Sequence, residues 1–389
     1  MNNIYKTIVI TLLGIFIIPT QLMAGNRDRS GQAGAQHLLI DPWARSAGWS
    51  TVGVAETRGL ESIYSNIAGM SFVKKTEIAF SRVQYISGSK TGIGVNAFAI
   101  SQHLTKKDKE SGAVKDLGVL GVSLFSQTLG EIMNTTVDQP EGNLGYFSPN
   151  LLYIGVHYAR KFNDYIFGGF TGKIINESIS NMSATGFCFD IGVQYRAGAY
   201  ENFKIGITLK NMGLPMRYSG DGISLSATPT GTDHEVTLQQ RSALMEMPSL
   251  LTIGISYDFL FFGKNYSSYT KEDLKKEGLT RDDAEHRITL AGSFTANSYS
   301  RDNFSFGIEY GLMQIFMVRA GFLAEQGMFN PEQVTTFYSG PSAGATFAIP
   351  LAGKNSKGDK GDKKLYLDYG YRFLNKWKGN HYVSLKLML

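Results

Sequence analysis

The sequence has little cysteine, proline, tryptophan or charge. Its 389 residues include one cysteine, three tryptophans and ten prolines, and charged residues make up 18%. A lone Cys188 excludes a disulfide framework and a thiolate metal site, and we predict it to be a small packed side chain within a strand. The formal net charge of +5 is small for this length and its contributors are spread out, so the sequence does not indicate a nucleic-acid-binding surface.

Signatures of catalysis and of cofactor binding are also missing. The sequence contains no G-x-S-x-G elbow, no H-E-x-x-H motif, no phosphate-binding loop and no dinucleotide fingerprint. Its six histidines, at positions 37, 103, 157, 234, 286 and 381, lack the spacing of metal ligands. Asp233, His234 and Glu235 are adjacent, but neighbours on an extended segment point to alternate sides. We therefore predict a protein that is not an enzyme and that has no cofactor and no metal site.

Only one long apolar run occurs, and it lies at the N-terminus. Residues 8–18 are apolar apart from a threonine and a glycine, they follow Lys6, and they precede Pro19 and a small residue at Ala24. This pattern predicts that residues 1–24 form a secretory signal peptide cleaved after Ala24. No later run approaches the roughly 18 apolar residues that a spanning helix needs, so a bundle of transmembrane helices is excluded.

The sequence is rich in glycine, tyrosine and phenylalanine, and several of its segments alternate strictly between apolar and polar residues. Between residues 150 and 211, four successive segments carry apolar side chains at every second position and Lys, Arg, Asp, Gln, Thr or Gly between them. Such a period of two predicts strands with one apolar and one polar face. The short connections around Asn163 and Gly198 require antiparallel neighbours. A sheet with an apolar outer face and a polar inner face is typical of a β-barrel in lipid.

We predict an all-β fold, a transmembrane antiparallel β-barrel of about 14 strands with an N-terminal plug. The strand candidates begin near Thr76, Thr91, Leu117, Asn150, Tyr165, Thr185, Phe203, Pro248, His286, Asn303, Gln314, Gly340, Lys364 and Asn380. An even number places both ends of the barrel chain on the periplasmic side. The last segment, 381–389, is expected to pair with the first strand, because an unpaired edge cannot remain in lipid.

Residues 25–75 lack the barrel pattern, and we predict that they form a periplasmic or lumenal plug before the outer-membrane barrel of residues 76–389. Leu60, Ile63, Tyr64 and Ile67 have helical spacing. The plug residues that we single out are Asp41, Trp43, Arg45, Tyr64 and Asn66. Asp41 and Arg45 are expected to anchor the plug by pairing with lumen charges such as Lys173, Asp190 or Arg196. Alternatively, these plug residues shape a ligand pocket or a lateral opening.

Three long insertions, 127–149, 211–247 and 325–339, are expected outside the cell if the first strand starts at the periplasm. Two charged segments, 263–285 and 353–363, are then expected in the periplasm. The insertion 211–247 is unexpectedly apolar for a loop that faces water, and an exposed apolar patch favours a protein-binding or lipid-binding surface. The residues predicted to form it are Leu214, Met216, Arg217, Tyr218, Met245 and Met247.

The segment 34–69 resembles the N-terminus of the PorV/PorQ family. It carries Gly-Ala-Gln at 34–36, an apolar triplet, Ala-Arg at 44–45 followed by Ala-Gly at 47–48, Gly-Val-Ala at 53–55 and Tyr-x-Asn-x-Ala-Gly at 64–69. Members of this family are FadL-like outer-membrane barrels of Bacteroidetes-type bacteria, tied to the type IX secretion system. Ile67 stands where the family usually has proline. Over the remaining length, the barrel pattern and the aromatic C-terminal strands are similar to the family.

The resemblance implies a non-enzymatic outer-membrane component of type IX protein secretion. PorV-like members bind the secretion pore protein and cargo C-terminal domains and deliver cargo to a surface attachment protein, whereas PorQ-like members anchor a surface protein. Outer-membrane lipid and lipopolysaccharide are the further partners expected, and nucleic acid is not expected. The alternative is a FadL-like outer-membrane transporter of hydrophobic small molecules. A lipopolysaccharide deacylase is a third hypothesis, for which the sequence offers no identifiable nucleophile.

Overall fold

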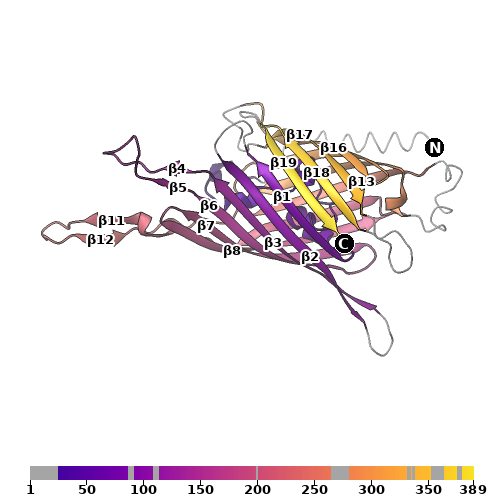
Figure 1. The fold of residues 1–389 in the computed structure, drawn as a ribbon, viewed down its shortest axis with the longest axis horizontal. Coiled ribbons are helices and arrows are strands. Elements are labelled where there is room, and N and C mark those ends of the chain that lie inside the picture. The colour runs from indigo at the N-terminus through magenta and orange to yellow at the C-terminus, as the bar shows by residue number, and fades with distance from the viewer. Residues whose placement is uncertain are drawn as a thin grey trace.

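Fourteen strands of the described chain form one antiparallel barrel in the computed structural model (Figure 1). The structure describes residues 25–389 except 86–91, 108–113, 199, 264–279, 331–333, 335–337, 352–362 and 375–378. The predicted signal peptide and most of the two charged segments expected in the periplasm lie outside the described residues. The barrel strands are β1 (Thr76–Gln84), β2 (Ile93–Lys107), β3 (Val114–Leu129), β6 (Asn150–Lys161), β7 (Ile166–Ile179), β8 (Met182–Ala197), β9 (Phe203–Gly213), β13 (Leu250–Phe261), β14 (His286–Asn297), β15 (Asn303–Leu312), β16 (Phe316–Glu325), β17 (Gly340–Pro350), β18 (Lys364–Arg372) and β19 (Asn380–Met388).

The barrel closes through the pairing of its first and last strands. β1 pairs antiparallel with β19, from Glu77 opposite Met388 to Gln84 opposite His381, and β8 pairs with both β7 and β9. Among the described residues, no barrel strand therefore has an open edge in lipid. The predicted fold class is confirmed, as is the pairing of the last segment with the first strand. The predicted strand starts differ from the observed ones by three residues at most, as at Leu117 and Thr185.

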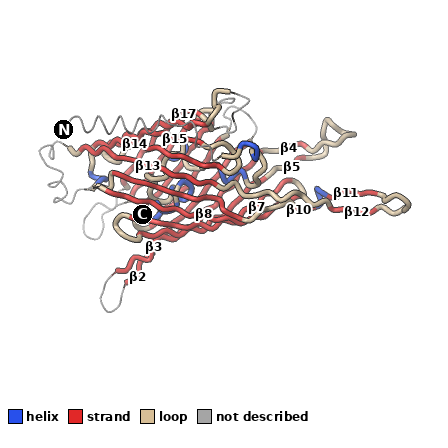
Figure 2. The backbone as a smooth tube through the Cα atoms, turned by 180° about the vertical axis from the view of Figure 1, so that it is seen from behind, coloured by secondary structure: helices blue, strands red, loops and turns tan. Residues whose placement is uncertain are grey.

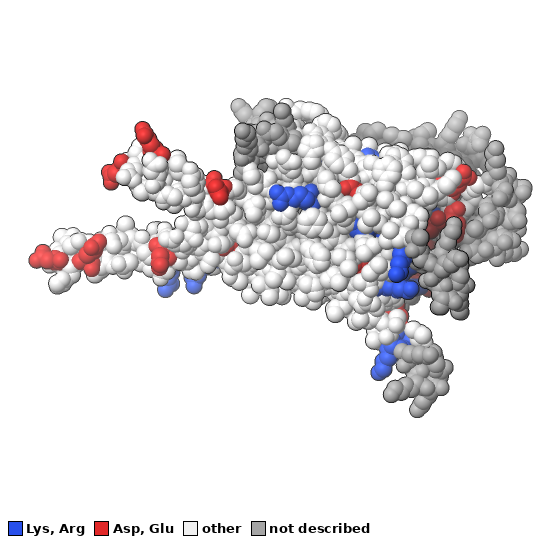
Figure 3. All heavy atoms as spheres, viewed as in Figure 1, with Lys and Arg blue, Asp and Glu red and all other residues white. Residues whose placement is uncertain are grey.

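Alternation decides which side chains face lipid. In β7, Phe170 and Ile174 are exposed on the outside, whereas Thr171 and Lys173 are buried in the interior. The same outward apolar face runs along the other barrel strands, and in the view of Figure 3 most of the barrel surface lacks charged side chains. Such an exterior stays out of water only in a bilayer, so the fold is that of an outer-membrane barrel. No helix in the described part of the chain is both long and apolar enough to cross a membrane.

The N-terminal segment, residues 25–73, packs inside the barrel (Figure 2). It contains short helices η1 (Arg27–Arg29), η2 (Gln36–Leu39), α2 (Ala44–Ala47), α3 (Ser62–Ser65) and η3 (Ile67–Phe72). Helix α2 contacts β17, β18 and β19, whereas η3 contacts β3, β6, β7 and β8. Because these two groups of strands belong to different parts of the wall, the segment fills the lumen across its width. Its apolar side chains Trp43, Leu60, Ile67 and Met70 are buried there.

The three long connections 130–149, 214–249 and 326–339 share one end of the barrel, called here the long-loop end, because successive antiparallel strands alternate in direction. β1 starts at the opposite end. Two hairpins project from the long-loop end, β4 (Ile132–Met133) with β5 (Tyr146–Phe147), and β11 (Ser224–Ala227) with β12 (Val236–Gln239) (Figure 1). Between β9 and β11 lie β10 (Ser219–Gly220), which pairs with β8, and η4 (Asp221–Ile223); η6 (Arg281–Asp283) lies at the opposite end. Which side of the membrane each end faces stays a prediction.

Candidate functional site

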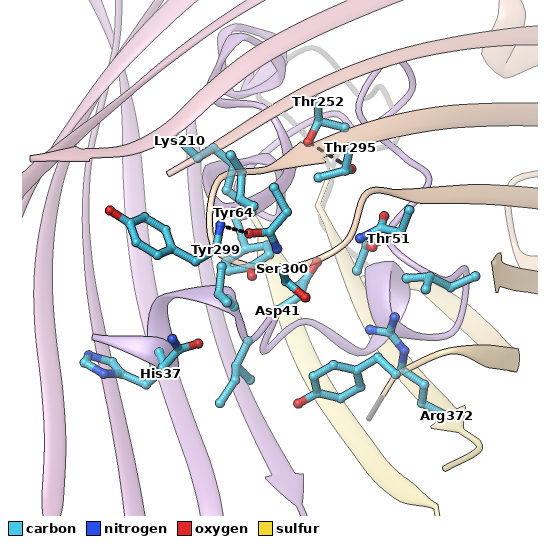
Figure 4. Close-up of a pocket in the computed structure, with 18 of the residues that line it drawn as sticks. His37, Asp41, Thr51, Tyr64, Lys210, Thr252, Thr295, Tyr299, Ser300 and Arg372 are labelled. Carbon is cyan, nitrogen blue, oxygen red and sulfur yellow. Dashed lines mark hydrogen bonds between the residues drawn. The ribbon is translucent and has the colours of Figure 1, made fainter. Parts of the chain in front are cut away.

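A cavity of about 710 Å³ lies between the N-terminal segment and the barrel wall at the long-loop end (Figure 4). Leu39, Ile40 and Asp41 line it from the N-terminal segment, and residues near the long-loop ends of the strands line it from the wall. Wall residues of this kind are Gln127, Leu151, Lys210, Leu250, Asn297 and Leu323. The lining therefore combines aliphatic side chains with many polar ones, a mixture that suits a small amphipathic molecule.

The Asp, Lys and Arg side chains of the lining are Asp41, Lys210 and Arg372. Lys210 Nζ lies 3.6 Å from the centroid of the Tyr64 ring, and Arg372 Cζ lies 4.4 Å from that of Tyr338. Aromatic faces stabilise these cations without neutralising them. Burial raises the pKa of Asp41 to about 6, while the backbone N–H of Trp43 donates a 3.0 Å hydrogen bond to its carboxyl oxygen and opposes that rise. The summed charge of Asp41, Lys210 and Arg372 is therefore positive near neutral pH.

A β-bulge in β9 positions Lys210. Lys210 and Asn211 together stand opposite the single residue Asp190 of β8, and Asn211 has a left-handed φ of 57°. The Asp190 carboxylate accepts a 2.7 Å hydrogen bond from the Asn211 backbone N–H and pairs with Lys173 at 2.6 Å. Both Lys210 and Asn211 consequently face the interior. Alternation alone does not reveal this bulge; the one local signal is an asparagine, which tolerates positive φ.

Ion pairs anchor the N-terminal segment to the wall at the end opposite the cavity. Glu56 contacts both Lys204 and Arg281, and Asp258 of β13 contacts the same two cations. Glu61 pairs with Lys386 at 3.0 Å. These groups are buried, so each charge depends on its partner for stabilisation. These paired charges therefore fasten the N-terminal segment to the wall at the end of the lumen opposite the cavity.

Arg45 belongs to a second buried cluster around Glu309. The Glu309 carboxylate lies 3.3 Å from Arg45 Nη2, 2.5 Å from Arg287 Nη2 and 3.0 Å from Arg319 Nε. Arg45 therefore pairs with a lumen charge, as we expected, but the partner is Glu309 and not Asp190. Among the described residues, Asp41 forms no ion pair with Lys173 or Arg196, so that part of the expectation is wrong. Lys173 and Asp190 satisfy each other, and Arg196 stacks on Phe72 with Cζ 3.9 Å from the ring centroid.

The other plug residues singled out from the sequence lie close to these contacts. Trp43 is buried, Tyr64 donates a 3.2 Å hydrogen bond to the Leu38 carbonyl, and both Asp41 and Tyr64 line the cavity. Asn66 donates to the carbonyls of Val54 and Val193 at 3.0 Å, and its side-chain oxygen accepts from Ala68 N at the start of η3. Their role in binding a ligand stays a prediction.

The predicted partner-binding loop is split between the interior and the surface. Met216 and Met247 are only 2% and 4% exposed, so the expectation that they face water is wrong for these two. They pack against Ala35, Leu38, Phe125 and other buried residues because the loop folds back over the N-terminal segment. Met216 and Met245 form a backbone bridge at 2.9 and 2.8 Å. Leu214, at 71%, and Arg217 are exposed, whereas Tyr218 and Met245 are half-buried. Binding of a partner by these residues is untested.

A histidine that we did not single out connects loop, plug and wall. His37 Nδ1 lies 3.2 Å from the Glu177 carboxylate of β7, and the Tyr218 hydroxyl donates a 2.6 Å hydrogen bond to the other carboxylate oxygen. The His37 ring stacks with Phe125 and Tyr153. This network holds the loop 214–249 against the N-terminal segment beside the cavity.

A serine–histidine contact occurs in the wall. Ser123 Oγ lies 2.8 Å from His157 Nε2, and Thr171 Oγ1 lies 2.9 Å from His157 Nδ1. All three side chains are buried, and none of them lines the cavity described above. The contact satisfies polar atoms within the sheet. Within the described residues, no group of three or more His, Cys, Asp or Glu side chains is placed to hold a metal ion.

No protein-family model and no curated protein sequence matches the chain. Among solved structures, the toluene transporter TodX of Pseudomonas putida is similar to it, with 12% identity over 90% of this chain and 96% of that chain and a TM-score of 0.49. The CymD monoaromatic hydrocarbon channel has 11% identity over 90% and 97%, with a TM-score of 0.48. A FadL homologue of Pseudomonas aeruginosa has 12% identity over 89% and 98%, with a TM-score of 0.45. Likenesses of this size assign no ligand and no activity to this chain.

Proposed function

We propose that this protein is an outer-membrane transporter that takes a hydrophobic or amphipathic small molecule into the cavity beneath its long loops. The observation that carries the proposal is the cavity itself, whose volume of about 710 Å³ falls in the range of binding sites for small ligands. Its apolar residues offer burial to a hydrocarbon portion. Its polar groups, Lys210 and Arg372 among them, offer contacts to a polar end.

The arrangement of the lumen supports binding rather than free diffusion of water-soluble solutes. A general porin keeps an open polar channel. Here the N-terminal segment fills the lumen, and the ion pairs of Glu56, Glu61 and Glu309 fasten it to the wall. A hydrophobic molecule gains from leaving water for the cavity, whereas a sugar or an ion loses hydration there and meets a lumen that the N-terminal segment occupies.

Filling the cavity should strongly reduce this function without disturbing the barrel. Thr252 of β13 and Thr295 of β14 are cross-strand neighbours that line the same wall of the cavity, with their hydroxyl oxygens 3.1 Å apart (Figure 4). A Thr252→Trp substitution places an indole in that space. We expect uptake of radiolabelled oleate or toluene by a deletion strain to fall by about tenfold, as a loss of about 1.4 kcal/mol of binding free energy would produce.

The matched control for this substitution is Thr230→Trp, on the exposed turn of the β11–β12 hairpin. It adds the same indole away from the cavity, and uptake should equal that of the unmodified protein. Barrel formation of both variants is checked by the heat-dependent shift in electrophoretic mobility. If folded Thr252→Trp protein transports both probes at the unmodified rate, the cavity is not the transport site.

A second candidate is the accessory role in protein secretion that the family resemblance implies, and the projecting hairpins favour it. On β11 and β12, Leu225 and Leu238 are direct cross-strand neighbours and remain 64% and 55% exposed. On the other hairpin, Tyr146 is exposed as well. Exposed apolar side chains on free two-stranded sheets are a form of surface that binds proteins.

The hairpin can be removed without touching the part of the loop that covers the cavity. Ser224 pairs with Gln239, so replacing residues 225–238 by Asn-Gly leaves a two-residue turn between them. The Met216–Met245 bridge stays in place. Under the secretion hypothesis, this variant should lose co-purification with the secretion pore protein and with cargo C-terminal domains but keep small-molecule uptake. Unchanged co-purification would remove the hairpin from that role.

A further inference from the structure

The first ten described residues, 25–34, run beside the cavity, which Ser30 and Gly31 line, and are called here the strap. The strap is tied to the loop between β14 and β15 and to the base of the loop before β13. Arg29 Nη2 lies 2.9 Å from the Glu246 carboxylate, and Arg29 Cζ lies 4.3 Å from the centroid of the Tyr299 ring. Gly34 N donates a 3.0 Å hydrogen bond to the Glu246 carbonyl. The strap therefore starts at the long-loop end, far along the barrel axis from the start of β1.

The beginning of the strap is fitted against one carboxylate. Gly25 N lies 2.8 Å from Asp302 Oδ2, and Asp302 Oδ1 accepts a 3.1 Å hydrogen bond from Asn297 N, which holds the carboxylate in place. A Cβ atom on residue 25 would lie 2.6 Å from Asp302 N and 2.8 Å from the Ser300 carbonyl oxygen. Only glycine fits this position without a shift of the loop. The contact with Asp302 is therefore specific to Gly25, and a neighbouring residue with a Cβ atom could not take its place without such a shift.

We infer that the bond between Ala24 and Gly25 is the processing site and that the α-ammonium group released there binds Asp302 as an intramolecular ion pair. Hydrolysis of this peptide bond consumes one water and leaves a carboxylate on Ala24 and an amine on Gly25, which takes up a proton near neutral pH. A backbone N–H offers Asp302 one neutral donor. The ammonium offers three donors and a full charge at the same place, and such charge-assisted bonds are the stronger kind.

The pair has a consequence for the cavity. Ser30 and Gly31 of the strap line the cavity, as do Tyr299, Ser300 and Asn303 from the loop that carries Asp302. The ion pair joins these two parts of the lining. Processing therefore strengthens the tie between these two parts of the lining; its effect on ligand binding rests on the proposed transport function, whereas the ion pair itself does not.

The first measurement is the intact mass of the mature protein purified from outer membranes, with sequencing of its first peptide. A chain that begins at Gly25 is expected. A chain that begins at any other residue overturns the inference, whatever the protein transports.

The second measurement is the rate at which an amine-reactive acylating reagent labels the α-amine between pH 6 and 9, read from the N-terminal peptide by mass spectrometry. Only the uncharged amine reacts, and a carboxylate partner keeps it protonated. In Asp302→Asn the labelling rate at neutral pH should rise by about tenfold, which corresponds to a fall of one unit in the pKa of the α-amine. Equal rates in the variant and the unmodified protein would overturn the ion pair.

The matched control is Asp28→Asn, which removes the same charge from an exposed side chain within the strap, and its rate should stay unchanged. Gly25→Ala tests the fit independently, because it keeps Asp302 and the ammonium but adds the Cβ that meets the loop. It should label as fast as Asp302→Asn, and labelling at the unmodified rate would contradict the inference. If transport is absent but the pair is present, only the proposed function fails.

Discussion

Replacing Glu309 by Gln is expected to lower the free energy of unfolding by about 3–5 kcal/mol, the usual cost of breaking a buried ion pair from one side. Glu309 is fully buried, and Arg45, Arg287 and Arg319 all point at its two oxygens. The amide removes the negative charge but keeps nearly the same shape. Three guanidinium groups then face one another without a carboxylate between them, so their mutual repulsion and their burial are uncompensated.

The measurement is a urea titration in detergent micelles, read by the electrophoretic shift between folded and unfolded barrel. Glu285→Gln is the control, because the Glu285 side chain is exposed at the end of the barrel and lies 3.9 Å from His286. It should leave the midpoint unchanged. A double variant, Glu309→Gln with Arg45→Gln, should cost less than the sum of the single changes, because the two side chains share one network. Full additivity would show that Arg45 is not coupled to Glu309.

Trp43→Ala is expected to cost about 3–5 kcal/mol of unfolding free energy, the range for removing a large aromatic side chain from a core. Trp43 is 1% exposed and packs with Leu60, Ile67 and Met70 between the N-terminal segment and the wall. The surrounding barrel is a closed ring of hydrogen-bonded strands and cannot collapse into the space left behind. The substitution should therefore loosen the N-terminal segment within the lumen.

Trp43→Phe is the control for this change. It keeps an aromatic ring in the same core and deletes the indole N–H, which has no hydrogen-bond partner in the described structure. Its cost should be well below that of the alanine variant. Limited proteolysis of the N-terminal segment in intact barrels gives a second reading, with faster cleavage expected for Trp43→Ala alone. Equal stability of the alanine and unmodified proteins would show that Trp43 does not hold the segment.

The outline of the barrel was predictable because each strand carries its own local signal. A period of two specifies both strand conformation and the face that meets lipid, and short turns specify antiparallel neighbours. In β7, the alternation of Phe170, Thr171 and Lys173 can be recognised from neighbouring residues of the strand alone. The number of strands and their starts followed from that repeated local rule, and the pairing of β1 with β19 followed from the exclusion of an open strand edge in lipid.

The contacts across the lumen were not predictable in the same way. Alternation says that Lys173, Arg196 and Glu309 face inward, but it does not say which of them meets Arg45. We predicted that Met216 and Met247 belong to an exposed patch because loops usually face water. Only the folded chain shows that the N-terminal segment lies beneath these two side chains. The bulge that turns Lys210 and Asn211 inward breaks the period-two rule on which the sequence argument depends.

For this protein the sequence by itself determined the barrel, since hydrophobic alternation is a property of neighbouring residues along one strand. The tertiary structure alone decided the cavity, the partner of Arg45 and the docking of Gly25 on Asp302. Arg45 and Glu309 are 264 residues apart, and Gly25 and Asp302 are 277 apart. The curvature of the closed wall and the path of the N-terminal segment through the lumen determine which residues so distant in sequence meet. A local sequence pattern predicts neither the curvature nor the path.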